Sequence, residues 1–146
     1  MIGAERLILI GCLLQGALGR EWAVWMPQSI EALSGSCVLI PCGFEIPSEY
    51  DPDMAQCTQT VKGMWSKGGT LLFDSSRQSG PPLQGKIAEN LAQKNCTTVL
   101  ENLPLSHSGQ YNFRLECNAR LKATFSQPVE MNIKEHFRVR QPAVLN

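Results

Sequence analysis

Apolar and polar residues alternate strictly along Ser108–Cys117. Tyr111, Phe113 and Leu115 fall on one side of this segment, and the residues between them fall on the other. A period of two residues predicts a β-strand that buries one face. By the same parity we expect the guanidinium of Arg114 on the outer face of the sheet.

Short extended segments separated by turn residues make up most of the remaining chain. The pattern predicts further strands at residues 22–25, 29–33, 36–42, 61–65, 71–73, 85–87, 95–100 and 124–134. Polar, turn-rich composition predicts loops at 46–58 and 75–82, and a turn or hairpin end at 118–122. Residues 90–94 fit a helical turn or a continued strand. Pro27 fits an edge strand that breaks and passes to the other sheet.

Three features of this strand pattern predict an immunoglobulin fold. The segment Ser-Gly-x-Tyr at 108–111 is the turn that carries a tyrosine corner, and Trp65 takes the place of the buried Trp on strand C. Cys42 shares the inward face of strand B with Val38 and Ile40. We expect an all-β, immunoglobulin-like V-set sandwich of two antiparallel sheets.

The N-terminus and the cysteine content indicate export. Arg6 precedes a short apolar run, and Ala17–Gly19 supplies small residues for a cleavage site, which predicts a signal peptide at 1–19. A buried helix fits poorly with the glycines of this segment. Six cysteines in 146 residues also indicate an oxidising compartment. We expect one domain at 20–135, then a linker or the start of a following domain at 136–146.

Composition excludes several classes of function. The chain is 43% hydrophobic and has no net charge, which fits one globular domain and argues against nucleic acid as a partner. His107 and His136 are isolated, so no metal or cofactor is expected. No Ser-His-Asp arrangement, carboxylate pair or phosphate loop is visible, which argues against an enzyme.

The cysteines of this chain depart from the antibody pattern. The second core cysteine normally follows the corner Tyr by two residues, but that place holds Phe113. Cys42 and Cys96 both face inward on strands B and E, which are neighbours in one sheet. We therefore predict a Cys42–Cys96 bridge within that sheet, with Phe113 filling space between the sheets.

Three other cysteines follow the predicted cleavage site. Strands C and F are antiparallel neighbours, and their register allows a Cys57–Cys117 bridge without requiring one. Five cysteines leave one without an internal partner, and Cys37 is the candidate, with a mate in a following domain.

The two N-terminal tryptophans lie three residues apart and so face opposite sides of a strand. We expect Trp25 in the core and Trp22 exposed. Asn95-Cys96-Thr97 is a glycosylation sequon whose Asn faces solvent. The alternative is an unoccupied Asn95, because a disulfide forming at Cys96 can compete with glycan transfer.

The motifs at 33–42, 95–97 and 108–114 together resemble the amino-terminal domain of the sialic-acid-binding immunoglobulin-like lectins, the siglecs. The likeness covers nearly the whole mature chain. A Cys37/Cys42 pair with a Cys on strand E and none on strand F is specific to very few immunoglobulin families. The resemblance implies the Cys42–Cys96 bridge and a bond from Cys37 to a second domain.

The resemblance also implies a function and its residues. Siglecs bind terminal sialic acid, and Arg114 matches the strand-F Arg whose guanidinium pairs with the sialate carboxylate. Trp22 matches the aromatic that packs on the sugar, and the strand around Thr124 matches the one whose backbone adds hydrogen bonds. Siglecs commonly carry a strand-G aromatic; this chain has Arg120 and Lys122 in that stretch instead. We include Arg120 with Arg114, Trp22 and Thr124 among the residues expected to bind sialic acid.

Two classes of function follow. The first is a cell-surface lectin module for sialylated glycans, extracellular and joined to a type I membrane protein through a part outside this sequence. The second is an immunoglobulin module that binds a protein partner through the same sheet. For Arg114 itself, the alternative to a ligand contact is a solvated side chain or an ion pair with Glu116.

Overall fold

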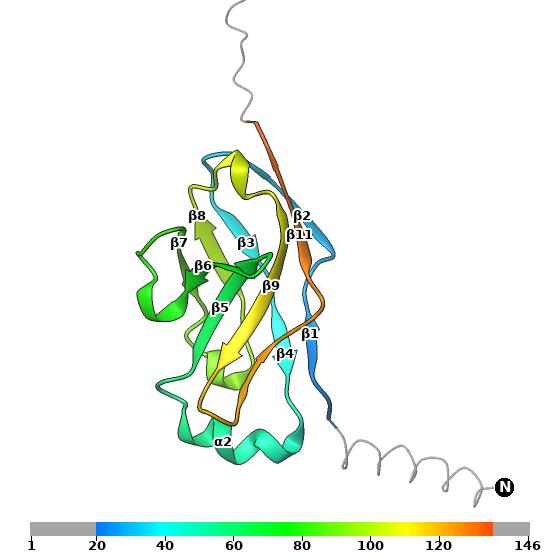
Figure 1. The fold of residues 1–146 in the computed structure, drawn as a ribbon, viewed down its shortest axis with the longest axis vertical. Coiled ribbons are helices and arrows are strands. Elements are labelled where there is room, and N and C mark those ends of the chain that lie inside the picture. Colours follow the sequence, from blue (N-terminus) through cyan, green and yellow to red (C-terminus); the bar gives the residue numbers. More distant parts are fainter. Residues whose placement is uncertain (1–19, 136–146) are drawn as a thin grey trace, which may run out of the picture.

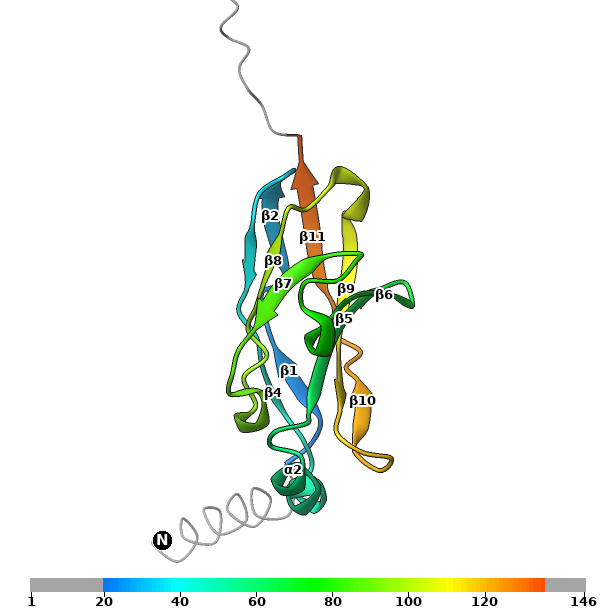
Figure 2. The same ribbon diagram turned by 90° about the vertical axis from the view of Figure 1, so that its left-hand side faces the viewer.

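A computed structural model describes residues 20–135. The predicted signal peptide at 1–19 and the predicted linker at 136–146 lie outside the described residues. The described chain folds into two layers of β-structure that lie face to face (Figures 1 and 2). The V-set sandwich expected from the sequence is confirmed.

The larger sheet carries the alternating segment at its centre. Its strand order is β2 (Ser29–Leu33), β11 (Val129–Lys134), β9 (Gly109–Glu116), β5 (Lys62–Lys67) and β6 (Thr70–Asp74). A short strand, β10 (Lys122–Thr124), pairs with the far half of β9. All pairs are antiparallel except β2 with β11.

The opposite layer consists of two smaller sheets. One has the order β3 (Val38–Ile40), β8 (Thr98–Glu101) and β7 (Gln84–Ile87), and the other pairs β1 (Ala23–Trp25) with β4 (Gly43–Glu45). Strand β1 therefore belongs to this layer and β2 to the larger sheet. The sheet change expected at Pro27 is confirmed, because both strands flank it.

Short helices join the strands. They are η1 (Ser48–Tyr50), α2 (Asp51–Gln56), η2 (Ser75–Arg77), η3 (Leu91–Gln93) and η4 (Leu105–His107). The prediction of a plain loop at 46–58 is wrong, because Pro52 stands in the first turn of α2, where a missing backbone N–H costs nothing. The ambiguous segment at 90–94 forms the helical turn.

Two predicted strands are interrupted. Strand B is split into β3 and β4 at Pro41 and Cys42, since Pro lacks the N–H that continues a ladder. Strand G is split into β10 and β11, which leaves residues 125–128 between them. This second break shapes the site described below.

Aromatic rings fill the space between the layers. Phe113 is fully buried and lies 5.3 Å from Trp65, 5.6 Å from Phe44 and 5.9 Å from Phe125, measured between ring centroids. The indole N–H of Trp65 donates to Oγ1 of Thr98, 2.9 Å away, which satisfies the buried polar groups of both. Phe113 thus occupies the interlayer space where antibody domains have a cysteine.

The tyrosine corner is present. The hydroxyl of Tyr111 donates to the backbone carbonyl of His107, and burial raises the pKa of Tyr111 to about 12. Because the folded pKa lies above the ordinary value of about 10, this phenol stabilises the fold below pH 10 and loses that contribution as the pH rises towards 12.

Both cysteine pairs suggested by the sequence form disulfides. Cys42–Cys96 joins adjacent strands of the smaller layer, with 4.8 Å between the Cα atoms. Cys57–Cys117 joins the end of α2 to the end of β9, with 5.8 Å between the Cα atoms. Cys37 is exposed and has no partner within residues 20–135.

One core prediction is wrong. Trp25 is 60% exposed, more than Trp22 at 41%. Parity placed these tryptophans on opposite faces of β1, but the inward position of this strand belongs to Val24, which is 6% exposed. Trp25 therefore lies on the outer surface of the smaller layer.

Candidate functional site

Arg114 lies on the outer face of β9 and is held there by two neighbours. Its Nε donates to Oε2 of Glu116 at 3.0 Å, and its Nη1 donates to Oγ1 of Thr124 at 2.9 Å. Thr124 is the direct cross-strand partner of Arg114 on β10. Within residues 20–135 Nη2 makes no hydrogen bond or ion pair, and the side chain is 33% exposed. The guanidinium is thus oriented, with one end open to solvent.

Positive charge dominates around this guanidinium. Lys62 and Lys122 flank Glu116 in the cross-strand register, one on each side. The Nζ of Lys62 lies 3.8 Å from Oε1 of Glu116. Three cations, Lys62, Arg114 and Lys122, surround one carboxylate, which leaves a local charge of +2. An anion reaching the open end of Arg114 is therefore attracted.

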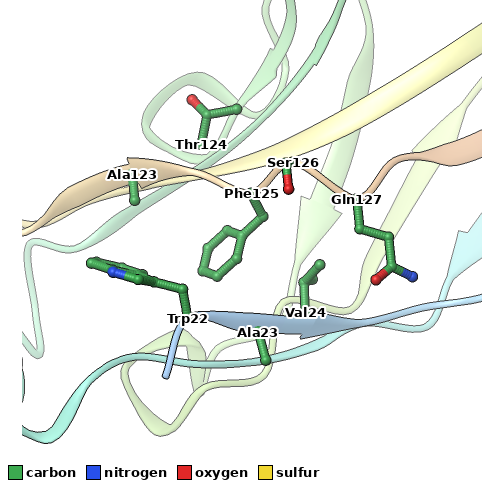
Figure 3. Close-up of a pocket in the computed structure, with 8 residues that line it drawn as sticks. All are labelled: Trp22, Ala23, Val24, Ala123, Thr124, Phe125, Ser126 and Gln127. Carbon is green, nitrogen blue, oxygen red and sulfur yellow. The ribbon is translucent and has the colours of Figure 1, made fainter. Parts of the chain in front are cut away.

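A groove opens at the edge of β10, and Thr124, the cross-strand partner of Arg114, is one of its lining residues. It is called the Arg114 groove below. Strand β1 pairs with β4 in the smaller layer and not with the larger sheet, so β10 has no partner on its far side among the described strands. The resulting space measures about 470 Å³. Residues 22–24 of β1 form one wall, and residues 123–127 form the other (Figure 3).

The open edge of β10 carries unpaired backbone groups. Cys117 N–H donates to Leu121 O and Phe125 N–H donates to Phe113 O, both at 2.9 Å. In an antiparallel ladder such pairs alternate with residues whose N–H and C=O point away from the partner strand. The N–H and C=O of Thr124 therefore point towards the open edge, where a ligand can bind them as a further strand would.

Trp22 stands at one end of the groove on an aromatic support. Its ring lies 5.2 Å from Tyr50 and 6.0 Å edge-on from Phe125. Figure 3 shows the rings of Trp22 and Phe125 in the groove between β1 and the segment after β10. Neither Tyr50 nor Phe125 belongs to a recognised motif, so their contacts with Trp22 could not be predicted from the sequence. These two rings support the indole, and Trp22 remains 41% exposed to solvent.

Arg120 was predicted at the sugar site, but its contacts lie elsewhere. Its Nε pairs with Oδ2 of Asp53 at 3.1 Å, its Nη2 donates to Glu49 O at 3.1 Å, and its guanidinium carbon lies 4.7 Å above the Tyr50 ring. Arg120 therefore joins the β9–β10 hairpin to α2, beside the Cys57–Cys117 disulfide. It supports Trp22 indirectly, through Tyr50.

Asn95, the sequon residue, lies on the smaller layer, and its side chain is held in place. Its Oδ1 accepts from Thr97 N–H at 3.0 Å, and its Nδ2 donates to Oδ1 of Asn90 at 3.0 Å. Cys37 lies exposed beside β3. Neither residue belongs to the Arg114 groove.

Within residues 20–135, no group of His, Cys, Asp and Glu side chains is arranged to hold a metal ion. No helix in this part of the chain is long and apolar enough to cross a membrane.

Comparison with known proteins finds that the chain is similar to two myelin proteins. It is 31% identical over 137 residues to human myelin-associated glycoprotein, which covers 91% of the chain and 22% of that protein. It is 27% identical to Schwann cell myelin protein of Coturnix japonica, which covers 88% of the chain and 22% of that protein. The chain thus spans about a fifth of the length of these relatives. No family model matches.

Among solved structures, the chain is similar to the first immunoglobulin domain of the mouse polymeric immunoglobulin receptor. The identity is 21%, the TM-score is 0.49, and the match covers 80% of this chain and 97% of that one. The human B7-H4 IgV-like domain matches with 15% identity and a TM-score of 0.49, over 79% of this chain and 98% of that one.

Proposed function

Because this chain is a siglec-like immunoglobulin domain homologous to myelin-associated glycoprotein, we propose that it is a lectin module that binds terminal sialic acid on cell-surface glycans. Sialic acid offers a carboxylate, an N-acetyl group and a glycerol chain on one ring. Around Thr124 the site offers a cation on the outer face of the sheet, an open strand edge and, across the groove, an aromatic ring. The proposal assigns one part of the sugar to each.

The orientation of Arg114 carries this proposal. A planar guanidinium matches a carboxylate in geometry, and a charge-assisted contact of this kind contributes about 1.5–3 kcal/mol. Glu116 and Thr124 hold the side chain through Nε and Nη1, which leaves Nη2 open. The surrounding charge of +2 favours the approach of the sialate.

The groove supplies the remaining contacts. Trp22 provides an apolar face for the N-acetyl or glycerol part of the sugar, and Thr124 provides a backbone N–H and C=O at the strand edge. One sugar on an open surface buries little area, so a single site should bind in the millimolar range, about −4 kcal/mol. Adhesion would then depend on many copies meeting many glycans.

The same proposal extends to the placement of the domain. The disulfides and the sequon fit an extracellular position, and Cys37 is exposed at the surface, where a following domain can supply a partner thiol. Asn95 is proposed as a glycan carrier.

The decisive experiment measures binding to a multivalent sialylated surface, with and without sialidase treatment. Arg114→Lys should weaken binding strongly, because the charge remains but the planar guanidinium, whose N–H groups match the two carboxylate oxygens, is lost. Arg114→Ala should weaken binding further, because the charge is lost as well. A loss of about 10- to 100-fold per site corresponds to the expected contact energy. Arg77→Ala, at an exposed Arg of η2, is the matched control and should bind normally.

Circular dichroism on the same samples checks the fold, which an outer Arg should hardly affect. A folded Arg114→Ala protein that binds as tightly as the parent, with binding still abolished by sialidase, would remove Arg114 from the site. Binding that survives sialidase treatment would overturn the lectin function.

One observation favours the second candidate, a module for a protein partner. A carboxylate, that of Glu116, already pairs with the Nε of Arg114, so the guanidinium is partly satisfied within the domain. The open edge of β10 would then accept a backbone segment of a partner. Binding to cells that is insensitive to sialidase and lost after protease treatment of the cells would support this function.

A further inference from the structure

Trp25, Gly43 and Asn95 lie in one row across three chain segments of the smaller layer. Trp25 pairs with Gly43 in the β1–β4 register, and Gly43 forms an isolated bridge with Asn95. Direct cross-strand partners point their side chains to the same face of a sheet. An adjacent residue on each segment is buried, namely Val24, Phe44 and Cys96, so the row itself faces outward.

The indole of Trp25 lies over the gap left by Gly43. A methyl group at Gly43 would stand 3.8 Å from Cε3 of Trp25, which is ordinary van der Waals contact. Glycine therefore leaves open the surface between Trp25 and Asn95. Trp25 remains 60% exposed, an unusual state for the largest apolar side chain.

The carboxamide of Asn95 is fixed by two hydrogen bonds. Its Oδ1 accepts from the N–H of Thr97, and its Nδ2 donates to Oδ1 of Asn90, each at 3.0 Å. An amide nitrogen has two hydrogens, and glycosylation replaces one of them, so the other can still donate to Asn90. The direction in which a glycan leaves Asn95 is therefore restricted.

The spacing suits one sugar ring. Neighbouring strands lie about 4.8 Å apart, which places Trp25 and Asn95 about 10 Å apart across the row. An Asn side chain with a pyranose on it and an indole reaching back over Gly43 can together bridge that distance. The C–H face of a pyranose is apolar and packs on an aromatic ring.

We propose that Trp25 is the stacking platform for the first N-acetylglucosamine of a glycan on Asn95. In the transfer step, Asn95 Nδ2 bonds to the anomeric carbon of the sugar. The bond from that carbon to the pyrophosphate oxygen of a lipid-linked oligosaccharide donor breaks, and the proton of Nδ2 leaves with the pyrophosphate. The sugar then covers Trp25. This inference is independent of sialic acid binding, because Trp25 and Asn95 lie outside the Arg114 groove.

The test uses the full chain secreted from cells that make only high-mannose glycans. One sample is trimmed with an endoglycosidase to a single N-acetylglucosamine, and a second is fully deglycosylated, which converts Asn95 to Asp. Hydroxyl-radical labelling with peptide mass spectrometry then gives the modification rate of each tryptophan. The rate of Trp25 should be at least about twofold lower with the sugar present, since one of its two ring faces is covered. Trp22 should show no change and serves as the internal control.

A second test compares the melting temperatures of the protein with and without the single sugar. The single sugar should raise the melting temperature of the parent by about 4 °C relative to the fully deglycosylated protein. Trp25→Ala should abolish this rise, whereas Leu39→Ala, at another exposed residue of the same layer, should retain it. Equal labelling of Trp25 in both samples, an unglycosylated Asn95 peptide, or a rise that persists in Trp25→Ala would each overturn the proposal.

Discussion

The segment 22–25, which ends in β1, contributes one tryptophan to each of two different surface regions. The Arg114 region contains Trp22, and its charged group, the guanidinium of Arg114, is held in place by Glu116 and Thr124. The Trp25 region is apolar and is built on an empty position, Gly43. The first is additionally clamped by the Cys57–Cys117 disulfide and by Arg120, and the second by the Cys42–Cys96 disulfide, whose cysteines are adjacent in sequence to Gly43 and Asn95.

The difference shows how each kind of recognition is prepared. A guanidinium must be oriented before it can meet a carboxylate at low cost, because a free Arg side chain loses rotamer entropy on binding. A stacking ring needs an open face, so the structure provides a glycine and no polar partner. The Arg114 region therefore depends on a side chain held by hydrogen bonds, and the Trp25 region on a ring face left open beside a glycine.

The largest expected effect comes from removing the clamp of the Arg114 region. Replacing both Cys57 and Cys117 with Ser should lower the free energy of unfolding by about 4 kcal/mol, because a long loop is released in the unfolded chain. Sialic acid binding should also weaken in the protein that remains folded, since the β9–β10 hairpin carries Thr124. Denaturant titration and the sialylated surface measure the two effects.

The exposed Cys37 supplies the matched control for this experiment. Cys37→Ser removes a thiol without breaking a disulfide and should change neither quantity. In the variant that lacks the Cys57–Cys117 disulfide, the labelling rate of Trp25 should stay as in the parent, because this disulfide lies outside the Trp25 region. A clamp variant with normal sialic acid binding would show that the hairpin needs no fixed support.

The two tryptophans give an intermediate effect that separates the regions directly. Trp22→Ala should weaken binding to the sialylated surface about 10-fold, because the sugar loses its apolar support. Trp25→Ala should leave that binding unchanged. Both variants should stay folded, since neither tryptophan belongs to the buried core: Trp22 is 41% exposed and Trp25 is 60% exposed. Equal losses in the two variants would mean that one ligand spans both regions.

The smallest expected effect tests the charge around Arg114. Glu116→Gln removes a negative charge from the path of the sialate while a hydrogen-bond acceptor for Nε remains, so affinity should rise about twofold at low salt. The gain should shrink as salt is added, because the group is partly exposed and screened. A fall in affinity would show that Glu116 is needed to orient the guanidinium through its full charge.

Sequence alone determined the features that follow from local pattern. Alternation at 108–117 placed Arg114 outward and Phe113 inward, and the same parity paired Cys42 with Cys96. The rule works because side chains of a strand alternate between faces whatever lies beyond the sheet. The sandwich and its sheet change at Pro27 followed from the same local signals.

Tertiary structure decided which residues meet. Parity separated Trp22 from Trp25 but could not show that both lie outside the core, because that depended on Val24 filling the core as β1 paired with β4. Arg114 and Arg120 are the same residue type six positions apart, yet one has an end open to solvent and the other is engaged by α2. Partners such as Asp53 are distant in sequence, and only the packing of α2 against the β9–β10 hairpin brings them within reach.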